Sequence, residues 1–482
     1  MVFTFISCED FLEEDPVDRY VANKFYNNAE DADAAVTAVY QVLFLIYERN
    51  IMSLNDLPTD TEKNGLGMPN QYLQNLEYLR FTSENQFVRQ MWQNNYDGIA
   101  RANTAILNIP EIDMDEDLKN RLLGESRFLR GLFYFNLVRF FGDVPLVLKI
   151  ESPEDAMIPR TDKEEVYNQI IEDLQFAENN LPVTASQSGR VTKGAAKTLL
   201  GKVFLEKGEY QSSVDKLAEI IEGGENYGYG LHENFRDNWR EETENGKESI
   251  LTVEFMDPPG VSNWAPQLNA PKYSIHEGAG VPGINNANEA DIPTVDLYNQ
   301  YSEEDGRKDG TFKLDYVSPT DGQTYTATIP LFGKYWEEGE TIMNRIGTNY
   351  HILRYADALL MFAEALNEIG QTPKALDYLN LVRERAFNGP EGNYSALSQE
   401  ELKEAILEER KLEFAYEGHR WFDLVRAGKL VETMEAHGMR EAELAESNKV
   451  EISDNIREAH NLYPIPQREL DLNSELTQNP GY

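Results

Sequence analysis

The sequence predicts a mainly α-helical fold, in which four helical hairpins of the tetratricopeptide (TPR) type form a superhelical scaffold with a large loop-rich insertion face. Three observations lead to this fold class. An amphipathic hairpin spans 350–386, an earlier copy of it spans 192–222, and the chain between them lacks helical periodicity. Because one hairpin cannot bury its own apolar face, the copies are expected to stack.

The hairpin at 350–386 is defined by apolar residues that recur at three- and four-residue steps along its first helix, 350–369. Gly370 is expected to end that helix. Thr372 is placed to cap the second helix, and Pro373 falls in its first turn, where proline is tolerated.

The copy at 192–222 aligns with this hairpin through its own turn glycine, and the alignment places Gly201 opposite Ala363. Small residues at such positions let two helices approach closely. A weaker copy of the first helix appears at 126–141, and a fourth candidate at 401–416 precedes a short helix from Trp421.

The repeats predict one interleaved domain over residues 19–482. The hairpins fall within about 115–222 and 350–430, with the insertion at about 226–349. The insertion is rich in Gly, Pro, Asn and aromatic residues and is too long for an ordinary loop. Long insertions on a repeat scaffold commonly carry the binding function.

A net charge of −40 argues against a nucleic-acid partner, because the chain repels phosphate backbones. One cysteine and six scattered histidines offer neither a disulfide nor zinc-ligand spacing, and no glycine-rich phosphate loop is present. No cofactor is predicted. The acidic run 302–305 lacks full EF-hand spacing, which leaves a structural calcium ion open.

The start of the chain suggests a lipid anchor. An apolar stub, VFTFIS, ends in a small residue before Cys8, as at the end of a lipoprotein signal, and the polar residues after it suit a tether. Residues 1–18 are therefore interpreted as a lipobox remnant and tether. The residues alone leave a chance cysteine as the alternative.

Several stretches together resemble the SusD/RagB family of surface glycan-binding lipoproteins. They occur in the family's order and span nearly the whole chain, which makes their combination specific. These stretches are 8–12, 92–103 (WQNNYDGIARAN), 127–145, 293–307, 354–370, 409–426 (ERKLEFAYEGHRWFDLVR) and 464–482, with PIP near its start and QNPGY at its end.

The resemblance implies a non-enzymatic protein that captures oligosaccharides or polysaccharides at the outer membrane, facing outward. It also implies a partner, a SusC-like TonB-dependent transporter over which the protein sits as a lid. It favours lipidation of Cys8 over a chance cysteine. It carries over no binding residues, because those vary with the glycan.

The candidate ligand-binding residues were chosen by residue type, since sugars stack on aromatic rings and bond to carboxylates and amides. Packing and loop capping are the competing interpretations. Trp92 and Trp421 are expected in the core. The predicted ligand-binding residues are Asn55, Asp56, Asp60, Tyr78, Trp264, Tyr273 and Trp336, with Tyr72, Trp239, Asn263 and Tyr335 as neighbouring candidates.

Two other functional classes stay open at this stage. A TPR scaffold could bind peptides, although strong acidity and long insertions suit that poorly. A glycoside hydrolase needs two carboxylates across the scissile bond, and Glu364, Glu409 and Glu417 flank apolar faces. Arg354 and Asp357, like Arg420 and Asp423, are three residues apart on predicted helices and can pair locally.

Overall fold

The computed structural model describes residues 25–65, 67–149, 155, 157–223, 227–257, 260–275, 280–337, 346–444 and 451–482. Cys8 and the predicted tether lie outside these ranges. The helices before the insertion are α2 (Ala29–Tyr47), α3 (Asn50–Asn55), α4 (Gln71–Glu77), α5 (Gln86–Asn108), α6 (Glu116–Phe141), α7 (Lys163–Asn180), α8 (Lys193–Glu206) and α9 (Tyr210–Ile221).

The helices of the insertion are short, and longer ones follow it. They are α10 (Ala265–Asn269), α11 (Val295–Gln300), α12 (Arg307–Thr311), α13 (Tyr355–Glu368), α14 (Thr372–Ala386), α15 (Gln399–Glu413), α16 (Arg420–Arg426), α17 (Leu430–Leu444), α18 (Glu451–Asn455) and α19 (Gln467–Leu472). The strands are β1 (Glu62–Asn64), β2 (Ser249–Val253), β3 (Asp291–Pro293), β4 (Phe312–Val317), β5 (Thr324–Phe332) and β6 (Tyr350–Arg354).

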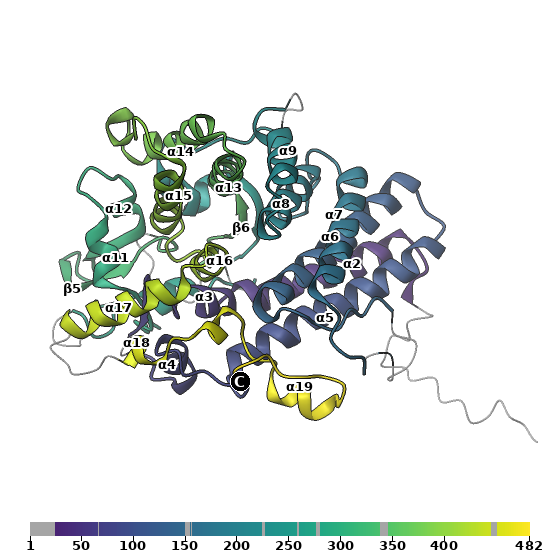
Figure 1. The fold of residues 1–482 in the computed structure, drawn as a ribbon, viewed down its shortest axis with the longest axis horizontal. Helices are drawn as coiled ribbons and strands as arrows, with labels where there is room; N and C mark the ends of the chain where they lie inside the picture. The colour runs from purple at the N-terminus through teal and green to yellow at the C-terminus, as the bar shows by residue number, and fades with distance from the viewer. Residues whose placement is uncertain are drawn as a thin grey trace, which may run out of the picture.

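The long helices form a curved scaffold in which each packs on the next, from α5 through α6, α7, α8 and α9 to α13 and α14. In Figure 1 they follow an arc from the right of the view, over α8 and α9, to the upper left. The mainly α-helical class is therefore confirmed, with α8–α9 and α13–α14 as the two hairpins that the periodicity predicted.

The hairpin α13–α14 differs from its prediction at two points. Residues 350–354 form strand β6 rather than helix, because they pair with β2, a partner that local periodicity does not reveal. Thr372 does not cap α14 but lies inside it, and its hydroxyl donates to Asn367 Oδ1. Gly370 follows the C-terminal end of α13, as predicted, and its φ of +78° is a conformation that favours glycine.

Close helix contact in α8–α9 depends on Gly201. A β-carbon there would lie 2.6 Å from the side chain of Leu217 on α9. Ser213, also on α9, donates from its hydroxyl to the Gly201 carbonyl at 2.8 Å. The small residue that the repeat pattern required therefore sits where the two helices touch.

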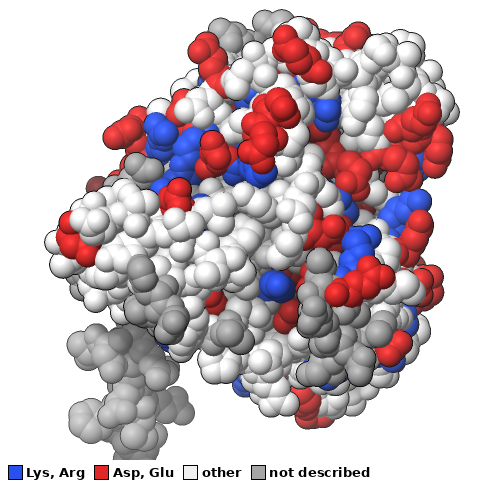
Figure 2. All heavy atoms as spheres, turned by 90° about the vertical axis from the view of Figure 1, so that its left-hand side faces the viewer, with Lys and Arg blue, Asp and Glu red and all other residues white. Residues whose placement is uncertain are grey.

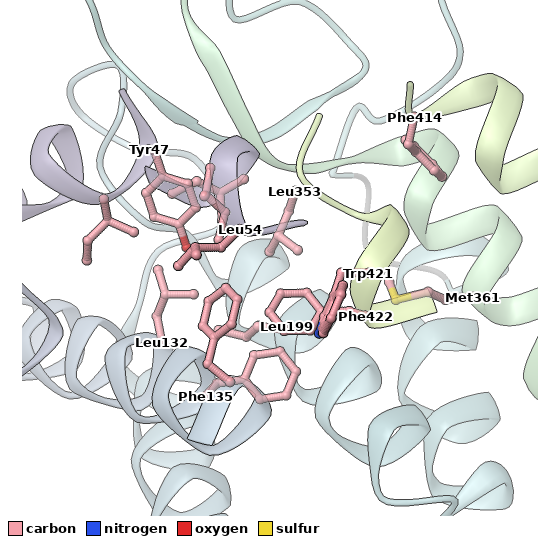
Figure 3. Packing of buried hydrophobic residues seen from close by; sticks show 14 of the residues in the cluster. Tyr47, Leu54, Leu132, Phe135, Leu199, Leu353, Met361, Phe414, Trp421 and Phe422 are labelled. Carbon is pink, nitrogen blue, oxygen red and sulfur yellow. The ribbon is translucent and has the colours of Figure 1, made fainter. Parts of the chain in front are cut away.

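The main hydrophobic core joins the scaffold to the segments around it. Figure 3 shows Tyr47 of α2, Leu132 and Phe135 of α6, Leu353 of β6 and Trp421 of α16 converging. Trp421 is fully buried. Trp92 on α5 is 4% exposed, which confirms both tryptophans as core residues.

The insertion lies on the left of Figure 1, where α11, α12 and β5 are seen. Its strands pair antiparallel with each other or with distant segments: β1 with β3, β2 with β6 and β4 with β5. The insertion has a second, smaller hydrophobic cluster of its own. Figure 2 looks onto this side, where carboxylates lie around a broad area without charged side chains.

A buried ion network ties the insertion to the scaffold. Arg354, 2% exposed, bonds to Glu417 (2.8 Å), Glu413 (2.7 Å) and Glu248 (2.7 Å). Arg307 of α12 reaches Glu413 at 3.0 Å, and its other partners are Asp305 and Glu409. Lys334 and Arg385 complete the network through Glu417 and Glu413 respectively.

The expected local pairs are not formed. Arg354 ends a strand rather than lying within a helix, so its side chain does not reach Asp357. Asp357 instead accepts bonds from Arg410 at 2.8 Å and Lys202 at 2.9 Å. Arg420 pairs with Asp60, far away in the sequence. Tertiary partners have overridden the spacing rule for exposed helices.

Candidate functional site

The candidate site is built where an early segment of the chain meets the insertion. Strand β1 pairs with β3, and the two backbones continue side by side, because Gly65 N–H donates to the Ala290 carbonyl at 2.7 Å. A β-carbon on Gly65 would lie 2.1 Å from the Glu289 carbonyl oxygen. Only glycine therefore allows this close approach of residues 62–65 to the insertion.

Glu289 fixes the backbone around Tyr273. It is 2% exposed, and its Oε2 accepts hydrogen bonds from three successive backbone N–H groups, those of Lys272 (2.7 Å), Tyr273 (2.8 Å) and Ser274 (3.0 Å). Lys272 Nζ donates to the Gly67 carbonyl at 3.0 Å and lies 5.1 Å from the Tyr273 ring centroid. The turn that presents Tyr273 is thus held from two sides.

Asn263 fixes the backbone around Trp264 in a similar way. Its backbone N–H donates to the Ile346 carbonyl at 2.9 Å, and its side-chain amide donates to the Thr348 carbonyl at 2.7 Å. Its Oδ1 accepts from Ala265 N–H at 2.9 Å, across the start of α10. Trp264 lies between these contacts with its side chain directed outward, 40% exposed.

Among the aromatic residues that the structure describes, three are exposed, one on α4 and two in the insertion. They are Tyr72 (40%), Trp264 (40%) and Tyr273 (43%). We call these three residues the aromatic face. Rings exposed to solvent on a backbone already held in place can stack on apolar C–H surfaces at little entropic cost.

The acidic residues predicted for the site lie inside the protein instead. Asp56 Oδ2 accepts from Gly418 N–H at 2.7 Å, and burial raises the pKa of Asp56 to about 7. Asp60 receives two bonds from Arg420, at 2.8 and 2.9 Å. Burial alone would raise the pKa of Asp60, but Arg420 and Lys411 hold it well below its usual range.

Asn55 is likewise buried, and its amide donates to the Ile51 carbonyl at 3.0 Å. Asp56 and Asp60 bond to the segment around α16, whereas the Asn55 bond stays within α3. These three residues therefore have a structural role in the described protein, and we leave them out of the aromatic face.

The remaining aromatic candidates also pack inward. Trp336 is 4% exposed and lies against Tyr316, with ring centroids 4.2 Å apart. Trp239 and Tyr335 are buried in the core beside the ion network. Tyr78 is half-buried at the end of α4, with the Arg80 guanidinium 4.9 Å from its ring centroid.

Lys272 and Glu289 hold the turn that carries Tyr273, and neither is among the residues predicted from the sequence. Lys272 adjoins Tyr273 and could have been found as its neighbour. Glu289 carried no signal, because the three N–H groups that it accepts from lie in a separate stretch of the insertion.

Within the residues that the structure describes, no group of three or more His, Cys, Asp or Glu side chains could hold a metal ion. Among the same residues, no helix is both long and apolar enough to span a membrane.

The chain is similar to known proteins over nearly its whole length. The SusD family model matches residues 261–482, and one described as "Starch-binding associating with outer membrane" matches 10–205. Two SusD-like proteins of Formosa agariphila are similar to this chain. SusD-like protein P38 is 30% identical, and the alignment covers 89% of this chain and 90% of P38. SusD-like protein P2 is 28% identical, and the alignment covers 100% of this chain and 98% of P2. A solved laminarin-binding SusD-like protein is 29% identical, with TM-score 0.79, over 95% of this chain and all of that one.

Proposed function

Because the chain belongs to the SusD family, we propose that it captures an oligosaccharide on its aromatic face and delivers it to a partner TonB-dependent transporter. The observation that carries the proposal is the aromatic face itself. Its three rings are exposed, whereas every other described aromatic side chain is buried or half-buried. Exposed aromatic rings beside polar backbone groups suit sugars, which have both apolar faces and hydroxyls.

The relatives support a glycan as the ligand. The solved protein that is 29% identical binds laminarin according to its description, and a solved structure from Bacteroides fluxus that is 25% identical is described as a surface glycan-binding protein. The glycan taken by this chain depends on its own insertion, so laminarin is the first probe rather than the assigned ligand.

The proposal includes a location. Cys8 carries a lipid that anchors the protein at the outer membrane, facing the cell exterior, with residues after Cys8 as the tether. The apolar stub before Cys8 and the outer-membrane association in the family description support this. In cells, Cys8→Ala should move the protein out of the membrane fraction, and a pull-down of the wild type should recover a transporter barrel.

The hydrolase hypothesis finds no support in the carboxylates that suggested it. Glu409 and Glu417 are buried and paired with Arg307 and Arg354. Glu364 pairs with Arg426. Each of these groups is paired with an arginine, so none is placed to act on a glycosidic bond.

Calorimetric titration of residues 19–482 against a panel of oligosaccharides, with a reducing-end assay on the same mixtures, tests the function. We expect binding without cleavage. Trp264→Ala and Tyr273→Ala should each lower the affinity about tenfold, the effect of losing one stacked ring. Leu107→Ala is the control, because Leu107 is 53% exposed on α5, outside the aromatic face. Release of reducing ends, or equal binding by all variants, would contradict the proposal.

A further inference from the structure

A second concave site lies outside the aromatic face. It is a groove of about 420 Å³ between α2, the loop 187–190 and β2. This volume falls within the range of small-ligand sites. Tyr40 and Phe44 line it from α2, and because they are four residues apart they share one face of that helix. Both rings are half-buried, so part of each faces the groove.

The wall opposite α2 is fixed in place. Arg190 bonds to Glu125 at 2.8 Å and to Asp33 at 3.0 Å, and its guanidinium lies 5.3 Å from the Tyr40 ring centroid. Gly189 has φ +77°, and a β-carbon there would lie 2.5 Å from Cγ of Glu254. The loop therefore rests directly on Glu254, which follows β2, and a ligand that enters the groove meets a preformed surface.

The rim of the groove offers free hydrogen-bonding groups. Gln41 and Gln187 are exposed, and neither side-chain amide has a hydrogen-bond partner among the described residues. An amide both donates and accepts, which matches the two roles of a sugar hydroxyl. Aromatic rings and free amides therefore line the same groove.

The groove and Trp264 are linked through one short stretch of backbone. Glu254, at the edge of the groove, accepts from the side-chain amide of Asn349 at 3.1 Å. Asn263, the neighbour of Trp264, donates to the carbonyl of Thr348 at 2.7 Å. Thr348 and Asn349 are consecutive, and consecutive Cα atoms are about 3.8 Å apart. Glu254 at the groove edge and Asn263 beside Trp264 are therefore hydrogen-bonded to two consecutive residues.

We propose that this groove is a second sugar subsite, which binds another part of the same oligosaccharide that stacks on Trp264. The inference rests on the function proposed above and extends it. It assigns the groove a ligand with paired hydroxyls and an apolar face, long enough to reach from Trp264 to Phe44.

The test is calorimetric titration with short and long fragments of laminarin, xylan, mannan, alginate and pectin. Phe44→Ala removes a ring of the groove, and Gln41→Ala removes the free amide of an exposed side chain. For the fragments that bind, we expect both variants to bind long ones about tenfold more weakly than the wild type and short ones equally well. Leu45→Ala is the matched control, because Leu45 adjoins Phe44, is 49% exposed and lies outside the groove.

Two outcomes would overturn the inference, and they are distinguishable. If long fragments bind the wild type, Phe44→Ala and Gln41→Ala equally, the groove is not a subsite, while the proposed function stands. If no fragment binds the wild type, the proposed function fails and the inference fails with it. Gln41→Ala keeps the test decisive should Phe44→Ala unfold, since Phe44 also packs on Phe255, with ring centroids 5.4 Å apart.

Discussion

Replacing Arg354 by methionine tests whether the buried ion network holds the insertion on the scaffold. The side chain makes five hydrogen bonds, to Glu248, to the Glu413 carboxylate and carbonyl, and twice to Glu417. Methionine fills a similar space but leaves these acceptors with one cation fewer. Removing one partner from a buried ion network costs about 3–5 kcal/mol, and we expect that loss in the free energy of unfolding.

Urea unfolding followed by tryptophan fluorescence measures the effect, since a lower midpoint at constant slope reports lost stability. The matched control is Lys403→Met. Lys403 pairs with Glu368 at 2.8 Å, but its side chain is 41% exposed, so its loss should cost less than about 1 kcal/mol. If Arg354→Met cost no more than this control, the network would not be what holds the insertion in place.

Three further predictions concern pH and the aromatic face. Burial would raise the pKa values of Glu413 and Glu417, but neighbouring arginines and Lys334 hold both below the ordinary value. Their contribution to the free energy of unfolding is therefore complete above about pH 4.3 and is lost as the pH falls further. The urea midpoint of the wild type should drop steeply in acid, and that of Arg354→Met should drop less. Burial and the neighbouring Asp291 raise the pKa of Glu62, so the protein loses stability as the pH rises above the ordinary pKa of a glutamate. Glu62→Gln should therefore raise the melting temperature more at pH 8 than at pH 5. Equal increases at the two pH values would contradict this reasoning. Glu289→Ala should weaken oligosaccharide binding about tenfold in calorimetry while the fold, checked by circular dichroism, stays intact, because the turn at Tyr273 loses its acceptor.

The hairpins could be predicted from the sequence because their packing is local. Apolar residues three and four apart define each helix, and a small residue such as Gly201 marks where two neighbouring helices touch. Strand β6 could not be predicted in this way. Its partner β2 lies far away in the chain, and a short apolar run beside a helix reads as part of that helix.

The site was only partly predictable for a related reason. Residue type identified Trp264 and Tyr273 as candidates, and the structure leaves both exposed. The same reasoning chose Asp56 and Asp60, whose partners Gly418 and Arg420 belong to the other end of the chain. Whether a carboxylate faces solvent or a distant arginine is decided by tertiary contacts that one sequence does not display.

The most direct test of glycan capture uses Trp264 as its own reporter. The chain has five tryptophans, and Trp264 is 40% exposed whereas Trp92, Trp239, Trp336 and Trp421 are each 4% exposed or less. Quenching of tryptophan fluorescence by acrylamide therefore reports mainly on this ring. With an oligosaccharide that binds in calorimetry, we predict protection from quenching in the wild type and none in Trp264→Phe. Full binding without protection of Trp264 would contradict the account, because the sugar would then lie elsewhere.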